Sequence, residues 1–440
     1  MSSRPTSGRP RLIQAMIDAF SLPDLRRRIL FTLGMLIVFR LVAHVPLPGV
    51  NLSALDQLFQ NVPLLGMLDL FSGGALRNFS IAAMGVYPYI TASIIMTILT
   101  PVIPQLQALS MEGEAGRNKI NTITHWLTIP LAALEAYGQI TYLRSQGIVS
   151  VTSGLTITTM VFSMIAGTVF LMWLGELITE RGIGNGISII IFGGIIAGYP
   201  QTVGRAFLAA GGGNYFGLIF YILILLATVV LIVYFTEAHR RIPVQYAKSV
   251  FRGGRMYRQS GSTHIPLRVN TAGMIPLIFA MSVVLFPGII ATYFMGPSDA
   301  PNFANTIYNW FRPDASLPVG FFYWGLYFLL TIGFAFFYTM VVFQQQDLAG
   351  VLQKQGGFIP GIRPGAQTKK YLDSVISHIT WAGAIYLGVV ALVPFIAQHI
   401  TGIAVQFSSM GLIIVVGVVL DTMKQLEAQL VMRRYEGFIK

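Results

Sequence analysis

Ten apolar stretches divide this chain of 440 residues, and most approach the roughly 20 residues with which a helix crosses ~30 Å of hydrocarbon. Only 10% of the residues are charged and 54% are hydrophobic, which excludes an ordinary soluble domain and a disordered chain. The pattern predicts an all-α polytopic membrane protein with ten transmembrane helices. We place the stretches near residues 29–46, 79–103, 120–142, 155–176, 183–203, 215–236, 271–295, 319–345, 375–398 and 402–423.

Lys and Arg are concentrated in alternate gaps between these stretches. If the N-terminus is cytoplasmic, the inner gaps and termini contain 24 of the 29 basic residues. Basic segments resist transfer across the membrane, so this asymmetry predicts that both termini are cytoplasmic. The outer gaps contain the remaining basic residues, which are Arg40, Arg77, Arg144, Arg205 and Arg312.

The gaps and the N-terminus suggest further elements. Residues 1–28 are basic, with an amphipathic part at 11–22 that we expect along the inner membrane surface, and they show no signal-peptide cleavage site. The longest inner gap, 237–270, is expected to form a protruding hairpin or a short helical element. The outer segment Gly296–Pro318 is expected to be a structured loop in which Trp310 is an interfacial anchor.

The outer segment Leu52–Leu70 has apolar residues at near-helical spacing but is too short to span a membrane. It is interrupted by Pro63 and Gly66 and followed by the sequence Ser72-Gly73-Gly74. Two interpretations are open. The segment could fold back into the membrane on a glycine hinge, or it could lie on the outer surface as an interfacial helix, which the spacing alone favours.

The sequence lacks the patterns of an enzyme or an ion-driven carrier. It contains no cysteine and no metalloprotease, phosphate-loop, nucleophile-elbow or dinucleotide motif, so we expect no catalytic residue, no metal and no cofactor. Ionisable residues of the spans, such as Glu135, Glu176 and Asp421, lie toward span ends rather than at mid-membrane, where carriers and proton pumps use them. The function class that remains is an apolar conduit, sealed by aliphatic side chains.

Several strings resemble the SecY family of protein-conducting channels, in order and at family-like spacing from about residue 20 onward. The strings are Phe71-Ser72-Gly73-Gly74-Ala75-Leu76, Glu112-Gly113-Glu114-Ala115-Gly116-Arg117, the run from Gly175-Glu176-Leu177 to Gly184-Asn185-Gly186, the run from Arg240-Arg241-Ile242-Pro243 to Lys248, His264-Ile265-Pro266-Leu267-Arg268-Val269-Asn270, the run from Gly357-Phe358-Ile359-Pro360 to Gly365, and Met432-Arg433-Arg434-Tyr435-Glu436. They favour the bacterial branch, which the chloroplast homologue also resembles.

The resemblance implies two pseudo-symmetric five-helix halves around a central hourglass pore. The first half would comprise residues 29–203, including a plug segment at 52–74, and the second would comprise 215–423. The cytoplasmic N-terminus at 1–28, the outer loop at 204–214 and the cytoplasmic tail at 424–440 complete the expected organisation.

The resemblance also implies a constriction formed by aliphatic side chains. Val86 and Ile90, and likewise Ile187 and Ile191, are spaced so that each pair shares one helix face. The alternative for each residue is an ordinary contact with lipid or a neighbouring helix, and Val86 stands where the family often has Ile. The expected pore ring consists of Val86, Ile90, Ile187, Ile191, Ile278 and Ile414.

The segment Leu52–Leu70 corresponds by resemblance to the family's plug, which reverses the preference for a surface helix. The expected plug and hinge residues are Leu64, Leu65, Leu68, Phe71, Gly73 and Gly74. Thr91 and Asn270 are expected at the lateral gate between spans 2 and 7, unless they serve only local helix capping or backbone satisfaction.

Inner loops 237–270 and 346–371 match the family's docking surface for the ATPase SecA and the ribosome. Such basic loops could also serve topology alone, but that role does not explain seven basic residues in one loop. Basic side chains also suit the phosphates of ribosomal RNA. The expected docking residues are Arg240, Arg241, Lys248, Arg252, Arg255, Arg258 and Arg363.

The resemblance therefore implies a passive channel in the bacterial plasma membrane that is not an enzyme. It would pass secretory proteins across the membrane and release membrane proteins sideways into lipid, driven by SecA or the ribosome. The implied partners are the small membrane subunits SecE and SecG, signal sequences, nascent polypeptides and membrane lipids. The alternatives are a small-solute secondary transporter and a scaffold for other membrane proteins.

Overall fold

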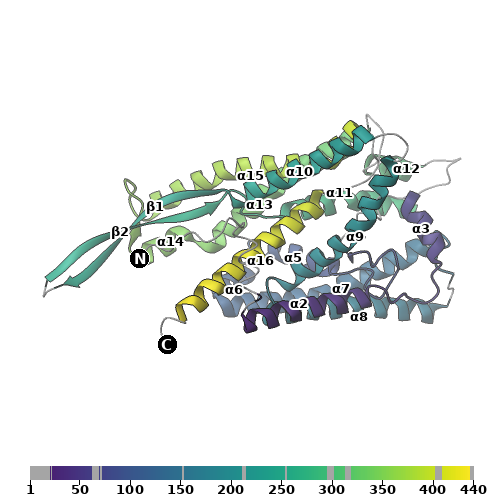
Figure 1. Cartoon of the computed structure of the whole chain (residues 1–440), viewed down its shortest axis with the longest axis horizontal. Coiled ribbons are helices and arrows are strands. Elements are labelled where there is room, and N and C mark those ends of the chain that lie inside the picture. The colour runs from purple at the N-terminus through teal and green to yellow at the C-terminus, as the bar shows by residue number, and fades with distance from the viewer. Residues whose placement is uncertain are drawn as a thin grey trace. The chain divides into compact units, whose positions relative to one another are not determined.

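The computed structural model describes residues 20, 22–61, 69, 72–150, 153–210, 215–252, 255–294, 302–312, 319–401 and 409–436. Within these residues, each predicted apolar stretch contains a helix (Figure 1). These helices are α2 (Pro23–Val42), α5 (Tyr87–Leu99), α7 (Glu114–Ser145), α8 (Gly154–Arg181), α9 (Gly186–Ala210), α10 (Tyr215–Glu237), α11 (Ile275–Phe294), α13 (Val319–Gln346), α15 (Ala366–Thr401) and α16 (Ser409–Glu436). Of the amphipathic part expected at 11–22, only residues 20 and 22 belong to the described chain.

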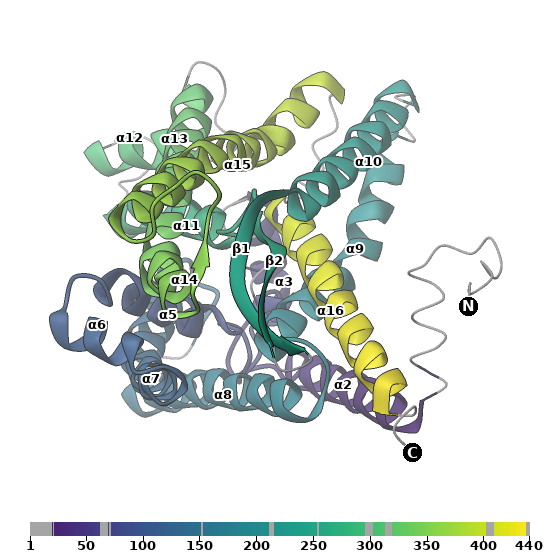
Figure 2. The ribbon, with the colours of Figure 1, turned by 90° about the vertical axis from the view of Figure 1, so that its left-hand side faces the viewer.

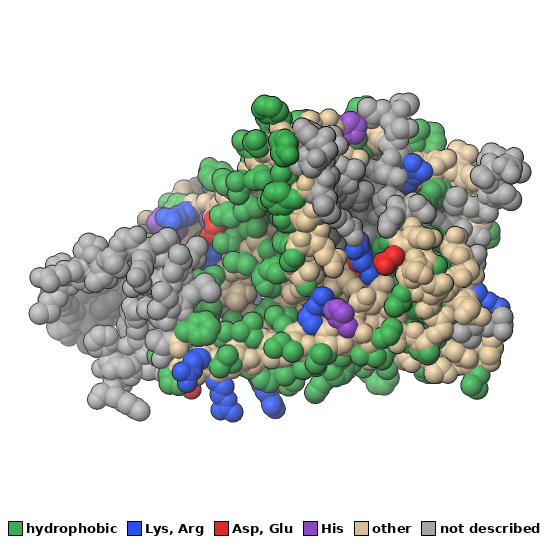
Figure 3. All heavy atoms as spheres, turned by 45° about the vertical axis from the view of Figure 1, so that its right-hand side comes forward, with side chains coloured by type: hydrophobic (Ala, Val, Ile, Leu, Met, Phe, Trp, Pro, Cys, Tyr) green, Lys and Arg blue, Asp and Glu red, His purple; other side chains and the backbone are tan. Residues whose placement is uncertain are grey.

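Several of these helices are suited to a membrane by length and composition. In the described residues, five helical segments are long and apolar enough to cross it, and the pair α5 and α6 (Pro104–Met111), bent by 98°, is a sixth candidate. Their outward side chains are apolar, as on α10, where Leu226, Val230 and Tyr234 are exposed. Apolar side chains cover much of the helical surface seen in Figure 3. This surface suits lipid and is unsuited to water.

The chain divides into two compact units. The first consists of Met1–Met96, Asn121–Gly204 and Ile414–Lys440, and the second of Thr97–Ile120 and Arg205–Ile413. The expected five-helix halves differ from these units at two places, because residues 97–120 belong to the second unit and most of α16 to the first.

The first unit has its main core where α3 (Leu52–Asn61), α7 and α8 meet. The fully buried side chains of Leu55, Ile140 and Met164 belong to one cluster, which also contains Phe79 and Ile148. α2 packs against α8, and Figures 1 and 2 both show these two helices together.

A smaller cluster of the first unit joins segments from near both ends of the chain. Leu25 of α2, Ile183 and Met423 of α16 belong to it. The backbone N–H of Ile183 also donates a hydrogen bond to Thr32 Oγ1 at 3.2 Å. These contacts hold α2 and α16 together within one unit.

The second unit contains α10, α11, α13 and α15 together with the short outer helix α12 (Phe303–Trp310). α15 packs against α10 and α13, and α11 packs against α12 and α13. Phe235 and Tyr386 stack in parallel between α10 and α15, with ring centroids 4.4 Å apart. In the expected outer loop, Trp310 ends α12 and contacts Phe322 of α13.

The long inner gap forms a hairpin, which confirms the first of the two expected alternatives. Strands β1 (His239–Arg252) and β2 (Arg255–Arg268) pair antiparallel along their whole length. Ile242 and Val244 are buried whereas Pro243 between them is exposed, the alternation of a strand with one covered face. The hairpin projects beyond the helices of its own unit (Figure 1).

Candidate functional site

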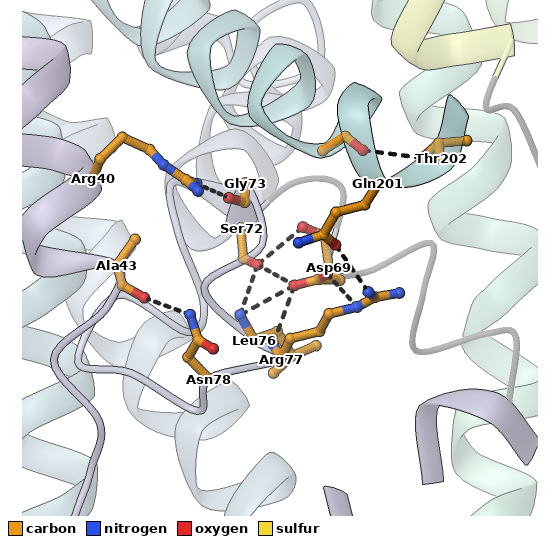
Figure 4. A network of polar contacts seen from close by, with 11 residues as sticks. Arg40, Ala43, Asp69, Ser72, Gly73, Leu76, Arg77, Asn78, Gln201 and Thr202 are labelled. Atoms are coloured by element: carbon orange, nitrogen blue, oxygen red, sulfur yellow. Dashed lines mark hydrogen bonds and ion pairs between the residues drawn. The ribbon is translucent and has the colours of Figure 1, made fainter. Parts of the chain in front are cut away.

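The turn that follows α3 is closed by a polar network around Asp69 (Figure 4). Asp69 Oδ1 accepts hydrogen bonds from Ser72 Oγ at 3.0 Å and from the backbone N–H groups of Leu76 at 3.1 Å and Arg77 at 3.2 Å. Short polar side chains stabilise such turns because they satisfy backbone donors that no helix or strand engages. The local sequence therefore fixes the turn.

Arg77 links this turn to two helices of the same unit. Its Nε lies 3.4 Å from Asp69 Oδ2, and its Nη1 lies 3.4 Å from Gln201 Oε1 on α9. Its guanidinium carbon is 5.6 Å from the ring centroid of Phe59 on α3, within cation–π range. One side chain thus contacts the turn, α3 and α9 (Figure 4 shows the turn and Gln201).

The charge of Asp69 is poorly solvated. The Asp69 side chain is 11% exposed and that of Arg77 is 29% exposed. Burial raises the pKa of Asp69, because removal from water penalises the carboxylate, and the opposing effects of Arg77, Ser72 and the backbone donors do not cancel it. The Asp69 carboxylate is therefore stabilised in the turn by Arg77, Ser72 and the backbone N–H donors.

The two glycines expected at the hinge adopt conformations that other residues rarely adopt. Gly73 and Gly74 have φ angles of +68° and +84°. A Cβ on Gly73 would lie 2.7 Å from Gly194 Cα and 2.9 Å from Phe39 Cζ, so the turn and α9 touch through their backbones. Arg40 Nη1 donates to the Gly73 carbonyl at 2.7 Å, which adds a tie to α2. The other expected plug and hinge residues, Leu64, Leu65, Leu68 and Phe71, lie outside the described residues.

The expected pore ring is distributed over both units. Val86, Ile191 and Ile414 of the first unit and Ile278 of the second are buried, and Ile90 is partly buried. Val86 precedes α5 rather than belonging to it, and its carbonyl accepts from the Ile90 N–H at 3.1 Å. This is the i to i−4 bond of an α-helix, so Val86 and Ile90 span the first turn of α5. The preceding residue, Gly85, has φ +58° and interrupts any helix there.

Ile187 has a contact that explains its partial burial. Its Cγ1 would lie 2.8 Å from a Cβ placed on Gly175, so the side chain fills the space that this glycine of α8 leaves open. The carbonyl of Gly175 also lies close to Gly186 at the start of α9. Ile187 thereby contributes to the packing of α8 against α9.

The two expected gate residues lie in different units. Thr91 Oγ1 donates to the Tyr87 carbonyl at 3.1 Å, the local backbone bond that the alternative interpretation expected. Asn270 is 9% exposed, and its Oδ1 has no hydrogen-bond partner in the described part of the chain. A buried polar atom without a hydrogen-bond partner is destabilising, so the position of Asn270 costs free energy of folding.

The loops 237–270 and 346–371 together form one platform, which contains β1, β2, α14 (Leu348–Lys354) and β3 (Gly357–Phe358). The sheet order is β2-β1-β3, so the second loop adds a strand to the hairpin of the first. Ile242, Val244, Leu352 and Ile359 share a buried cluster with residues at the start of α15. The platform therefore has its own core.

The platform exposes three of the expected docking residues. Arg240, Arg241 and Arg363 are exposed. Arg363 lies between Gly361 and Gly365, which have φ angles of +82° and +101°, and its carbonyl accepts from Thr368 Oγ1 at 2.9 Å. The loop is thus fixed at the backbone while the guanidinium faces outward. The remaining expected residues, Lys248, Arg252, Arg255 and Arg258, belong to the hairpin by backbone, and their side chains are outside the described part.

Two features were missed by sequence reasoning. Asp69, Arg77 and Gln201 were not selected, although an aspartate three residues before a serine and two glycines is a recognisable turn signal. The pairing of β1 with β3 had no comparable signal, because β3 is only two residues long.

Solved structures share this fold. A protein-conducting channel covers 94% of this chain and 96% of its own, with a TM-score of 0.64 and 15% sequence identity. A SecY protein whose plug domain stabilises the closed state and maintains a membrane seal has a TM-score of 0.63, with 16% identity and coverage of 94% and 96%. Sec61 from the canine ribosome–channel complex has a TM-score of 0.62, with 16% identity and the same coverage. The chain is thus a polytopic helical membrane protein with the fold of these channels.

The sequence relationship is closer and spans the whole length. The family model described as SecY matches residues 80–423. The protein translocase subunit SecY of Streptomyces scabiei is 43% identical over 454 residues, which cover 98% of this chain and 100% of that protein. The SecY subunit of Halalkalibacterium halodurans is 44% identical over 441 residues, with the same coverage. The chain belongs to the SecY family.

Proposed function

We propose that this chain is the central channel subunit of a protein translocase, which passes secretory proteins across the membrane and releases membrane proteins sideways into lipid. One observation carries the proposal. The chain matches translocase subunits along 98% of its length at 43% identity, and it has the fold of protein-conducting channels. It is a channel subunit rather than an enzyme, and its driving force comes from outside the chain.

The proposed conduit lies between two five-helix halves, 29–203 and 215–423, and is sealed by the pore ring. Burial of Val86, Ile191, Ile278 and Ile414 supports the ring, because a narrow aliphatic constriction excludes water and ions. The contact of Ile187 with Gly175 weakens the case for that member. Thr91 and Asn270 are proposed gate residues, and the segment 52–74 is the proposed plug on its glycine hinge.

The platform is the proposed docking surface for SecA and the ribosome. Its support is the combination of exposed Arg240, Arg241 and Arg363 with a folded core that holds them in fixed positions. A ribosome is present in the structure of the Sec61 relative. We further propose SecE and SecG as small membrane partners, with signal sequences, nascent polypeptides and membrane lipids as ligands of the channel.

The proposed location is the bacterial plasma membrane, with both termini in the cytoplasm. The support is the concentration of 24 of 29 basic residues on one side of the predicted spans, together with the bacterial origin of the relatives. A membrane-impermeant maleimide applied to intact cells should label a cysteine at Arg144 but not one at Lys369. Labelling of the Lys369 position alone would show that the protein has the opposite orientation.

Crosslinking of a stalled secretory chain tests the channel against the alternative of a small-solute secondary transporter. The protein has no cysteine, so Ile191→Cys in the ring and Val230→Cys on the exposed face of α10 give a matched pair. In vesicles, the stalled chain should crosslink to residue 191 and not to residue 230. Crosslinks at neither position, together with uptake of a small solute, would favour the transporter.

A further inference from the structure

The hinge contains an ion pair whose two members are unequally exposed. Asp69 is almost fully buried and accepts three hydrogen bonds through Oδ1, while its Oδ2 faces Arg77 Nε at 3.4 Å. The pair joins the two ends of the glycine hinge, since Asp69 precedes Gly73 and Gly74 and Arg77 follows them.

We propose that Arg77 is the positioning residue that sets the threshold for plug release, because it neutralises a buried carboxylate that otherwise favours the open hinge. The proposal rests on the proposed channel and names the residue that determines how readily it opens. Removing one member of a buried pair leaves an uncompensated charge, which is far more unfavourable than the loss of the pair as a whole. When Arg77 moves away, solvation of Asp69 favours opening of the turn.

The other contacts of Arg77 make its departure a concerted event. The same guanidinium faces Phe59 of α3 and Gln201 of α9, so its movement weakens three connections together. α3 is the described helix of the plug segment, and its Leu55 is buried in the core of the first unit. Loss of the Arg77 contacts therefore acts on the seat of the plug helix.

This arrangement predicts an asymmetry between the two members of the pair. Arg77→Gln should open the hinge, because it leaves the buried carboxylate without a cation. Asp69→Asn should keep it closed, because the amide oxygen can still accept the three bonds and no charge is buried. The double variant should also remain closed. Arg77→Lys keeps the positive charge, so its hinge should remain about as closed as that of the parent protein.

Cysteine reactivity measures the opening without any substrate. Leu55→Cys introduces a single thiol that is buried when α3 is seated, and every variant carries it. In vesicles of the complete translocase, Arg77→Gln should raise the rate of maleimide labelling by at least about tenfold, and addition of Asp69→Asn should return the rate to that of the parent. Arg144→Gln, which removes an exposed outer arginine, is the matched control and should leave the rate unchanged. Equal rates in the double variant and in Arg77→Gln would overturn the proposal.

Ion conductance and pH provide independent readouts. Arg77→Gln should raise the conductance of resting vesicles, and the double variant should not. Burial raises the pKa of Asp69, so acidification should protonate it and reclose the Arg77→Gln channel, whereas the double variant should show no such pH dependence. In the contacts of the described residues, Asp69 faces Arg77, Arg40 of α2 reaches the Gly73 carbonyl, and Phe59 of α3 and Gln201 of α9 contact Arg77.

The labelling result is separable from the proposed function. If the chain were not a protein channel, the variants would still differ in Leu55→Cys labelling, but precursor translocation would respond to none of them. If the channel is correct and the role of Arg77 is wrong, translocation proceeds and the asymmetry between the single and double variants is absent.

Discussion

Gln245 of β1 and Phe358 of β3 lie opposite each other in an antiparallel ladder that joins two inner loops far apart in the sequence. In the neighbouring pair, Tyr246 packs against Gly357, because a Cβ on Gly357 would lie 2.9 Å from Tyr246 Cε1. The basic residues of both loops are therefore presented by a single folded platform, and damage to its core should affect both loops.

Leu352→Ala should destabilise the platform while leaving the membrane spans inserted. Leu352 is 3% exposed and belongs to the core beneath the sheet, so truncation removes buried apolar contacts and leaves a cavity. The free energy of unfolding should fall by about 2–5 kcal/mol. Hydrogen exchange of the β1 and β3 amides should accelerate. Val351→Ala on the same helix is the control, because Val351 is 43% exposed. Equal effects of both substitutions would contradict the assigned core.

Arg363→Glu should yield a stable, correctly oriented protein that binds signal sequence but fails in ATP-driven translocation. Orientation depends on the summed charge near span ends, so one change among many leaves it intact. Docking differs, because a guanidinium offers planar, multidentate hydrogen bonds that Glu cannot replace. The measurement is translocation of a precursor into vesicles with SecA. Lys370→Glu, at an exposed position near the start of α15, should have a smaller effect. Normal translocation by the Arg363 variant would show that this residue contributes only to membrane orientation.

Gly194→Ala should loosen the plug hinge. The Cβ of the new alanine would lie 2.5 Å from Gly73 Cα, so α9 and the turn at Gly73 must move apart. We expect this overpacking to cost about 1–3 kcal/mol of stability. The resting conductance of reconstituted vesicles should rise. Gly198→Ala on the same helix meets no atom within 4 Å and should behave as the parent. If both variants conduct alike, the contact between α9 and the hinge does not contribute to the seal.

Ile414→Asn or Ile278→Asn should weaken the closed state and admit precursors with defective signal sequences. Both side chains are buried, at 0% and 5% exposure, and a polar group in an aliphatic constriction allows water to enter. Translocation of a precursor with a defective signal sequence measures the effect. Unchanged signal stringency together with unchanged conductance would remove these residues from the ring. The corresponding substitution at Ile187, which packs against Gly175, should instead lower stability.

Features that depend on local sequence were predictable. Each predicted apolar stretch overlaps a helix, and the gap 237–270 forms the hairpin that was one of its two expected alternatives. Gly73 and Gly74 have positive φ angles, which glycine adopts readily. Span 2 was predicted to begin too early, because hydropathy continues through residues 79–86 whereas the positive φ angles of Phe79 and Gly85 prevent a helix there.

The sequence by itself determined the positions of the spans, the basic character of the inner loops and the absence of catalytic motifs, because hydropathy, charge and motif spacing belong to short stretches of chain. Only the tertiary structure decided that Arg77 meets Asp69, Phe59 and Gln201, that Gly73 touches Gly194, and that β3 completes the sheet of β1. The contacts of Arg77 with Gln201, of Gly73 with Gly194 and of β3 with β1 join segments that are remote in sequence and are brought together by burial of apolar surface, which composition and periodicity do not specify.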